Sequence, residues 1–316
     1  MKFVPIESKD FDVILREYSI GERVSHKRCK VALENAVYIL ETTKGKFVLK
    51  RFDHTKENYI KYQNKIESFL IKKKIPLPKI IKSKKGSLLI HYKKKPVQIQ
   101  AFVKNKKPKL TNALVKEIGK IVGKMDACLL EFPLNGKFIW EKEYQFKKRK
   151  LRKNLFSAAN LCKIQSCVVD RIRTLDKTKL KKSVIHGDAN MINMLFDKNR
   201  LVGVIDFGDV HEDYLLTDPM FFISDKLMHA SGIDYSKVKI FLKSYTKYVA
   251  LNDEELKAVL YFSQLRCLFS IDWINRMIKK HPDQKKELKW YFNLRYNENK
   301  MLSKVTAEEF LLKIKS

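Results

Sequence analysis

Residues 184–206 constrain the fold of this 316-residue chain more than any other part of the sequence. They read V-I-H-G-D-A-N-M-I-N-M-L-F-D-K-N-R-L-V-G-V-I-D. A short apolar run precedes a polar loop, and two further apolar runs, separated by the turn at 197–200, lead to Asp206. Short apolar runs around a cluster of turn formers predict a β-hairpin. That hairpin returns Asp206 to the loop that contains Asp188 and Asn193.

These three side chains have the chemistry of phosphoryl transfer. Asp188 is a candidate general base for a hydroxyl group, and Asn193 and Asp206 offer oxygen ligands for Mg²⁺. Each alone would be an ordinary turn, cap or strand-end residue, because Gly, Asn and Asp favour turns. Together, H-G-D in place of H-R-D followed by D-F-G forms the kinase signature in altered form. The spacing therefore predicts an ATP-dependent kinase.

The same motifs resemble a known family. H-G-D-x-x-x-x-N followed by I-D-F-G-D is similar to the aminoglycoside phosphotransferase and choline kinase superfamily of small-molecule kinases. The stretches 34–38 and 42–49 resemble homoserine kinases of this fold, and 205–211 also resembles hydroxylysine kinases. The resemblance extends over most of residues 1–225.

The resemblance implies a two-lobed protein-kinase-like fold of the α+β class. An antiparallel β-sheet N-lobe at 1–103 and an α-rich C-lobe at 104–316 are expected. ATP and Mg²⁺ are the implied cofactors, and the implied acceptor is a small molecule with a hydroxyl group, first of all a homoserine-like amino acid or an amino alcohol. Asp218 matches a family residue that braces the catalytic loop, and His186 is expected to support the site.

Candidate nucleotide contacts lie in the first part of the chain. Lys50, in the third predicted strand, is placed to reach the α- and β-phosphates, because a strand fixes its stem. Glu67, on the next predicted helix, is a candidate to orient Lys50. The adenine is expected at backbone groups of residues 98–102, which include Gln100 and Phe102.

Apolar periodicity gives a coarse map of elements. Strands are predicted at 24–33, 36–42, 46–52, 88–92 and 97–103, and helices at 8–20, 56–73, 109–130, 146–166, 234–248 and 254–277. A Lys/Pro-rich connector at 104–109 marks the lobe boundary. On or near the apolar face of the last helix lie four residues, for which structural ion pairs are favoured over acceptor contacts: Arg266, Asp272, Trp273 and Arg276.

The net charge of +31 invites a different interpretation. A strongly basic chain is the electrostatic footprint of a nucleic-acid binder. Here the excess is mostly Lys, spread over many surface turns, with few interleaved aromatic residues for base stacking. A solvated basic face is therefore favoured, and no specific nucleic-acid partner is expected. The charge also argues against a polycationic aminoglycoside acceptor.

Three alternatives stay open beside the small-molecule kinase: an antibiotic phosphotransferase, a protein kinase, and an inactive kinase fold that only binds. The protein kinase lacks an A-P-E-like anchor, and the inactive fold would be expected to lack one of the three site residues. The five cysteines indicate neither a disulfide framework nor a zinc site. Without an apolar stretch of membrane-spanning length or a signal-like N-terminus, a cytoplasmic protein without membrane contact is expected. The oligomeric state is not predicted.

Overall fold

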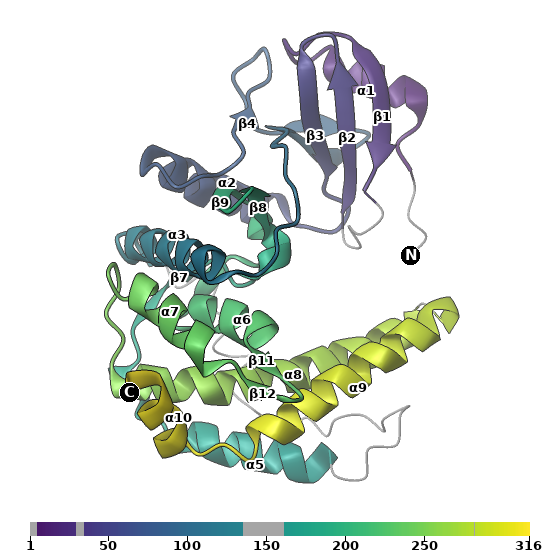
Figure 1. The fold of residues 1–316 in the computed structure, drawn as a ribbon. Coiled ribbons are helices and arrows are strands. Elements are labelled where there is room, and N and C mark those ends of the chain that lie inside the picture. The colour runs from purple at the N-terminus through teal and green to yellow at the C-terminus, as the bar shows by residue number, and fades with distance from the viewer. Residues whose placement is uncertain (1–4, 30–34, 135–160, 281) are drawn as a thin grey trace. The chain divides into compact units, whose positions relative to one another are not determined.

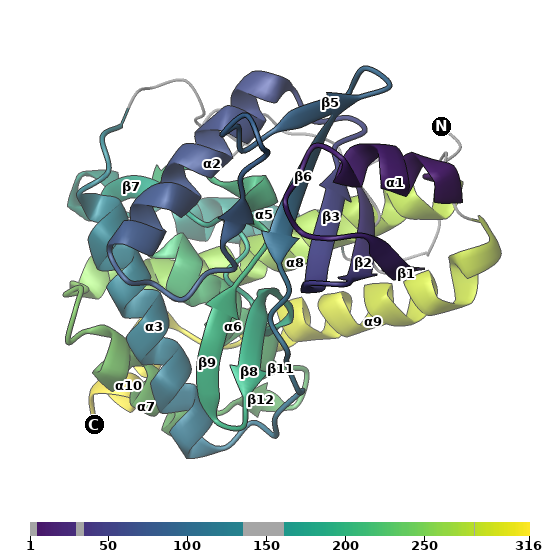
Figure 2. The same ribbon diagram turned by 90° about the horizontal axis from the view of Figure 1, so that it is seen from above.

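The computed structural model describes residues 5–29, 35–134, 161–280 and 282–316. The chain divides into two compact units, unit 1 with residues 1–108 and 195–205 and unit 2 with residues 109–194 and 206–316. Unit 1 contains an antiparallel sheet and unit 2 is mostly helical (Figures 1 and 2). The predicted α+β class is confirmed.

The sheet of unit 1 has the strand order β1-β2-β3-β6-β4, and β5 also pairs with β6. Its strands are β1 (Arg23–Arg28), β2 (Ala36–Thr42), β3 (Gly45–Arg51), β4 (Ile80–Ile81), β5 (Ile90–Tyr92) and β6 (Lys95–Ala101). Along β2 buried and half-buried side chains alternate, because successive residues of a strand point to opposite faces. The predicted strands appear with shifted ends, and residues 30–33 of the first lie outside the described residues. The two-residue β4 is too short to show a periodic pattern.

Helix α1 (Ser8–Leu15) covers one face of this sheet. Phe11 is fully buried and packs edge-on against Tyr38 of β2, with ring centroids 5.0 Å apart. The helix was expected to extend to residue 20, but tight turns close it, with the amide of Tyr18 donating to the carbonyl of Leu15 at 3.0 Å. Tyr18 therefore enters the core from a turn rather than from the helix.

Helix α2 (Glu57–Lys72) is tied to β6 by two amide side chains. Gln98 Nε2 donates to Asn64 Oδ1 at 2.7 Å, and Gln100 Nε2 donates to Glu67 Oε2 at 3.2 Å. All four side chains are buried or half-buried. Because a buried polar group is costly without a partner, these bonds fix the register of α2 on the strand.

Unit 2 is built from helices α3 (Asn112–Leu130), α5 (Leu161–Arg173), α6 (Thr217–Lys226), α7 (Tyr235–Tyr245), α8 (Asp253–Lys280), α9 (Lys285–Leu302) and α10 (Ala307–Lys315). Two short antiparallel pairs accompany them, β7 (Lys182–Ile185) with β10 (His211–Tyr214) and β11 (Met228–His229) with β12 (Gly232–Ile233). Helices α8 and α9 run side by side, as Figures 1 and 2 show. Of the helix predicted at 146–166, residues 146–160 lie outside the described residues.

Helices α3 and α7 pack unusually close together. A Cβ on Gly119 would lie 2.6 Å from the carbonyl oxygen of Phe241, and one on Gly123 would lie 2.7 Å from that of Tyr245. Only glycine permits such contact between a helix and a neighbouring backbone. This packing allows Tyr245 to reach Asp126, one turn further along α3.

The hairpin predicted after the catalytic loop is confirmed as β8 (Met194–Asp197) and β9 (Arg200–Val204). Residues 195–205 group with unit 1. The amide of Lys106 donates to Phe196 O at 3.0 Å, and the amide of Val204 donates to Pro76 O at 2.8 Å. The local sequence pattern predicts the hairpin but does not show where it packs.

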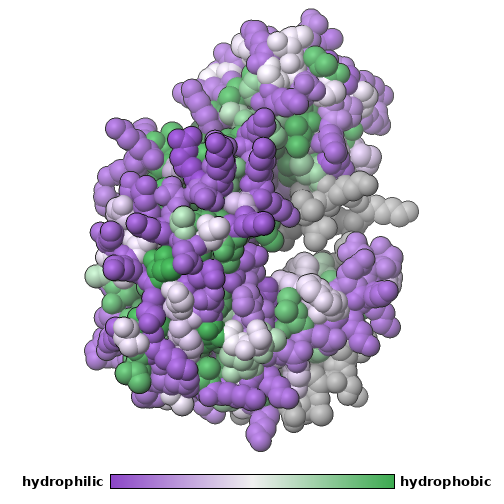
Figure 3. Space-filling view, in the orientation of Figure 1, coloured by the Kyte–Doolittle hydropathy of each residue, from purple (hydrophilic) through white to green (hydrophobic). Residues whose placement is uncertain are grey.

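Hydrophilic side chains cover most of the face shown in Figure 3, as a chain with 66 Lys and Arg residues requires. Small apolar areas lie between them. None of the helices in the described part of the chain combines the length and hydropathy needed to cross a bilayer.

Candidate active site

The candidate catalytic loop, residues 186–193, connects β7 to the short 3-10 helix η2 (Met191–Asn193). Apart from the exposed Lys182, β7 is buried, and it pairs with β10 along its whole length. Gly187 turns the chain out of β7 with a φ of 78°, in the left-handed region that favours glycine. The turn places Asp188 just beyond the end of the strand.

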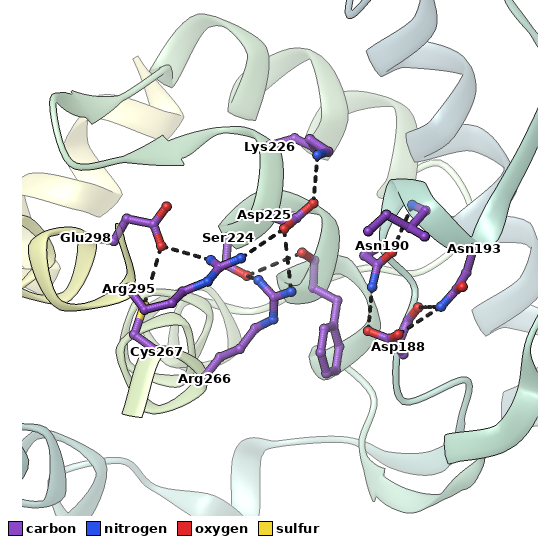
Figure 4. Close-up of polar contacts among 12 residues, drawn as sticks. Asp188, Asn190, Asn193, Ser224, Asp225, Lys226, Arg266, Cys267, Arg295 and Glu298 are labelled. Carbon is purple, nitrogen blue, oxygen red and sulfur yellow. Dashed lines mark hydrogen bonds and ion pairs between the residues drawn. The ribbon is translucent and has the colours of Figure 1, made fainter. Parts of the chain in front are cut away.

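Two amide side chains of the same loop hold the carboxylate of Asp188 (Figure 4). Oδ1 accepts a hydrogen bond from Asn190 Nδ2 at 2.6 Å, and Oδ2 accepts one from Asn193 Nδ2 at 2.8 Å. The backbone amide of Asp188 donates to Nδ1 of His186 at 3.2 Å. Each carboxylate oxygen keeps a further lone pair, so Asp188 can still accept a hydrogen bond from a hydroxyl.

The same bonds fix the orientation of the Asn193 amide. Its Nδ2 donates both to the carboxylate of Asp188 and, at 3.0 Å, to the carbonyl oxygen of Asp188. Both partners only accept hydrogen bonds, so the nitrogen has to face them. The carbonyl oxygen Oδ1 of Asn193 consequently points away from Asp188, in the orientation that a metal ligand needs.

Asp206 precedes the 3-10 helix η3 (Phe207–Asp209) and has a φ of 65°, which is uncommon for a residue with a side chain. It is exposed. No cluster of three or more His, Cys, Asp or Glu side chains suited to a metal occurs among the described residues. Mg²⁺ usually binds through one or two carboxylates together with water and phosphate oxygens. An exposed carboxylate and an amide oxygen fit that pattern.

Asp218, at the start of α6, holds the beginning of the loop. It is fully buried, and its two oxygens accept hydrogen bonds from the backbone amides of His186 at 2.7 Å and Gly187 at 2.9 Å. His186 is also fully buried and packs against Phe207 with ring centroids 4.5 Å apart. These contacts bring Asp218 and His186 together with Asp188 and Asn193.

The environment adjusts the acidity of Asp188. Burial raises the pKa of Asp188, while the positive charge of Arg266 and the hydrogen bonds from Asn190 and Asn193 counteract the effect. The net result is a pKa above the ordinary value for an aspartate. A more basic carboxylate is a better proton acceptor as long as it is ionised at the working pH.

The remaining candidates lie in unit 1. Lys50 is on β3, paired with Gln98, and its ammonium lies 5.2 Å from the centre of the Phe52 ring. Glu67 accepts a hydrogen bond from Gln100, so it contacts the strand beside the one that carries Lys50. The amide of Phe102 donates to Lys46 O at 3.2 Å, which leaves the carbonyl of Phe102 as its backbone group for a ligand.

A cavity of about 640 Å³ in unit 2 adjoins Asp188. One part of it is lined by Gly187, Asp188, Asn190 and Asp209, and α6, α8 and α9 line the rest. Its wall contains five aromatic side chains and two arginines: Phe221, Phe262, Phe269, Trp273, Tyr291, Arg266 and Arg276. The cavity therefore offers apolar surface, cations and the candidate base to one bound molecule.

Four residues of this region were not assigned to the site from the sequence. Asn190 had a detectable signal, since an Asn two residues after Asp188 can bond both the carboxylate and the amide of Ile192. Asp126 sits four residues after Val122 and so shares the apolar stripe of α3. Tyr245 and Asp209 gave no comparable signal.

Three comparisons place these features among known proteins. The model of a family described as "Phosphotransferase enzyme family" matches residues 26–240. A homoserine kinase from Methylobacillus flagellatus is 23% identical over 99% of this chain and 98% of its own length. A homoserine kinase from a Bradyrhizobium species is also 23% identical, over 94% of this chain and 95% of its own length.

Solved structures agree on the fold. An amicoumacin kinase in complex with AMP-PNP and Ca²⁺ superposes with a TM-score of 0.75 at 16% identity, with 96% of each chain covered. A microcompartment-associated aminopropanol kinase superposes with a TM-score of 0.72 at 15% identity, with 98% of each chain covered. The two-lobed kinase-like fold expected from the sequence is thereby confirmed.

Proposed function

The chain belongs to the phosphotransferase enzyme family, and we propose that it phosphorylates the hydroxyl group of a small amino acid of the homoserine class. Transfer of the γ-phosphoryl group of ATP to an alcohol is the reaction of such a kinase. Two homoserine kinases that align over nearly the whole chain support the acceptor class. The observation that carries the proposal is the Asp188 carboxylate, oriented by two amides and adjoining a cavity.

Asp188 has two tasks in this reaction. It accepts a hydrogen bond from the acceptor hydroxyl and so aligns the attacking oxygen, and it receives the proton as the oxygen bonds to phosphorus. The bonds from Asn190 and Asn193 hold the carboxylate in one orientation before the acceptor arrives. Asp218 keeps the start of the loop in place through two amides. Such prior orientation lowers the entropy lost in reaching the transition state.

Asn193 and Asp206 are proposed to hold Mg²⁺, through the amide oxygen and the carboxylate respectively. When bound, Mg²⁺ neutralises charge on the phosphate groups. Lys50 is proposed to contact the α- and β-phosphates, with Glu67 as its orienting partner, and residues 98–102, among them Gln100 and Phe102, are proposed to contact the adenine.

A second candidate acceptor is a larger amine such as an aminoglycoside. The cavity of about 640 Å³ supports it, because pockets of this size hold drug-sized ligands. Aromatic side chains in the wall would suit the faces of such a ligand. The same wall contains the cations of Arg266 and Arg276 beside the carboxylates of Asp188, Asp209 and Asp272, so its charge does not decide between the two acceptors. The two homoserine kinases that align over nearly the whole chain favour the small amino acid.

A panel assay tests the proposal. Purified protein with Mg-ATP is offered hydroxylated amino acids, amino alcohols and aminoglycosides, and both ADP release and the phosphorylated product are measured. Homoserine-like acceptors are expected to give the highest kcat/KM. Asp188→Asn should lower kcat by about 10²-fold or more, whereas Asp197→Asn in the exposed hairpin turn should leave kcat unchanged. Product formation only with aminoglycosides would refute the amino acid assignment.

A further inference from the structure

Arg266 lies in the wall of the same cavity as Asp188 and is held there rigidly (Figure 4). Only 13% of its side chain is exposed. Nη1 donates to Ser224 Oγ at 2.9 Å, Nη2 lies 3.7 Å from Asp225 Oδ1, and the guanidinium lies 5.0 Å from the centre of the Phe221 ring. A guanidinium has five N–H donors, so these contacts position Arg266 and leave further donors for a ligand.

Positive charge is in excess behind this part of the wall. Asp225 is shared by three cations, with Arg295 at 3.2 Å and Lys226 at 3.0 Å in addition to Arg266. Arg295 also pairs with Glu298 at 2.8 Å. Burial raises the pKa of Asp225, but the three cations outweigh burial and hold it below its ordinary value. Three cations thus face two carboxylates.

A buried charge is costly unless a partner compensates it. Beyond this group, the charge of Asp188 also acts on Arg266, but within the described part of the chain the two side chains form no ion pair or hydrogen bond with each other. The second arginine of the wall differs. Arg276 is 60% exposed and pairs with Asp272 at 3.3 Å one helical turn away, so solvent and a neighbour already compensate it.

We propose that Arg266 binds the carboxylate of the acceptor and makes the enzyme select hydroxy amino acids over amino alcohols. This inference rests on the proposed function and identifies the side chain that recognises the substrate. An arginine fork matches the two oxygens of a carboxylate and forms two charge-assisted hydrogen bonds with it. Because Asp188 and Arg266 line one cavity, a single small molecule can present its hydroxyl to the first and its carboxylate to the second.

The matched substrates are homoserine and 3-amino-1-propanol, which differ only by the carboxylate. The wild-type enzyme is expected to prefer homoserine in kcat/KM by on the order of 10- to 100-fold, the usual worth of hydrogen bonds to a charged group. Arg266→Met should remove most of that preference by raising KM for homoserine, while kcat/KM for 3-amino-1-propanol stays within about 3-fold. Arg266→Lys should retain part of it, because it keeps the charge but loses the fork.

Three design points keep the outcomes distinct. Rates are compared on the alkaline plateau of the pH profile, since loss of Arg266 also changes the charge near Asp188. Thermal unfolding is recorded for each variant. If Arg266→Met is unstable, Arg266→Lys takes its place in the comparison, because it leaves a cation beside Asp225. Arg173→Met, at a 65% exposed surface position on α5, is the control and should leave kcat/KM unchanged for both substrates.

An equal loss of kcat/KM for both substrates in Arg266→Met would mean that Arg266 contributes to phosphate binding or folding. That result would overturn the inference and leave the kinase assignment intact. A preference that disappears in Arg276→Met but not in Arg266→Met would also overturn it. If the wild-type protein phosphorylates neither substrate, the proposed function itself fails.

Discussion

Asp126 and Asp218 are two fully buried carboxyl groups whose charges interact with each other. Both carboxylate oxygens of Asp218 accept hydrogen bonds from backbone amides of the candidate catalytic loop. Asp126 accepts a hydrogen bond from the Tyr245 hydroxyl on Oδ2 at 2.7 Å, and its Oδ1 is buried without a donor among the described residues. Burial raises the pKa of Asp126 well above its ordinary value, and the charge of Asp218 raises it further. A proton retained on Asp126 would relieve the repulsion between the two carboxylates.

The raised pKa of Asp126 gives a stability prediction with a definite sign. A carboxyl with a raised folded-state pKa stabilises the fold below its unfolded pKa of about 3.9 and loses that contribution as pH rises toward the folded pKa. In Asp126→Asn, a permanent amide donor replaces the proton. We expect this variant to gain stability relative to the wild type as pH rises from mildly acidic to mildly alkaline, measured by urea unfolding.

Asp126→Leu is the matched comparison, because leucine has a similar size but leaves both Tyr245 and Asp218 without this partner. Compared with Asp126→Asn, it should lower the free energy of unfolding by about 3 kcal/mol at any pH, since buried polar groups lose their bonds. If the stabilities of Asp126→Asn and the wild type change in parallel with pH, Asp126 does not carry the proton.

The parts of the site that the sequence predicted are local. Asp188 and Asn193 belong to one short loop, and a hairpin with clear turn chemistry separates them from Asp206, so spacing alone sufficed to single out all three. The pairing of Asp126 with Asp218 depends on close packing of α3 against α7 and on the position of α6, which no short pattern encodes. Arg266 was expected to form a structural ion pair. It does so with Asp225 and also lines the cavity, a combination visible only in three dimensions.

Asn190 provides a pH test of the base. Burial raises the pKa of Asp188, and the hydrogen bond from Asn190 is among the effects that lower it. Asn190→Ala removes that bond, so the pKa of Asp188 should rise further. Because only the ionised carboxylate accepts a proton, the acidic limb of the kcat/KM profile should move to higher pH. Asn199→Ala, in the exposed hairpin turn, is the control and should leave the limb in place. A limb that moves to lower pH in Asn190→Ala would contradict the role of Asp188.

Metal dependence separates the two proposed ligands from the other residues of the loop. Asp206→Ala should abolish Mg²⁺-dependent turnover, and Asn193→Ala should raise the Mg²⁺ concentration needed for the half-maximal rate. Asn193 also bonds Asp188, so Asn190→Ala serves as the matched control: it removes an equivalent bond to Asp188 without removing a proposed ligand. Identical Mg²⁺ titrations for the Asn193 and Asn190 variants would rule out Asn193 as a ligand.

Gly187 tests how sensitive the reaction is to the position of Asp188. Its φ of 78° disfavours a side chain, and a Cβ would collide with the carbonyl oxygen of Asp209. Gly187→Ala must therefore shift the backbone next to Asp188, and a displacement of about 1 Å commonly costs about 10²-fold in rate. Gly86→Ala is the control, because Gly86 has a similar φ of 80° with nothing within 4 Å of the added Cβ. Both variants should lose about 1 to 3 kcal/mol of stability through backbone strain, but only Gly187→Ala should lose turnover of the acceptor. Full activity in Gly187→Ala would show that the loop can place Asp188 correctly without the glycine turn.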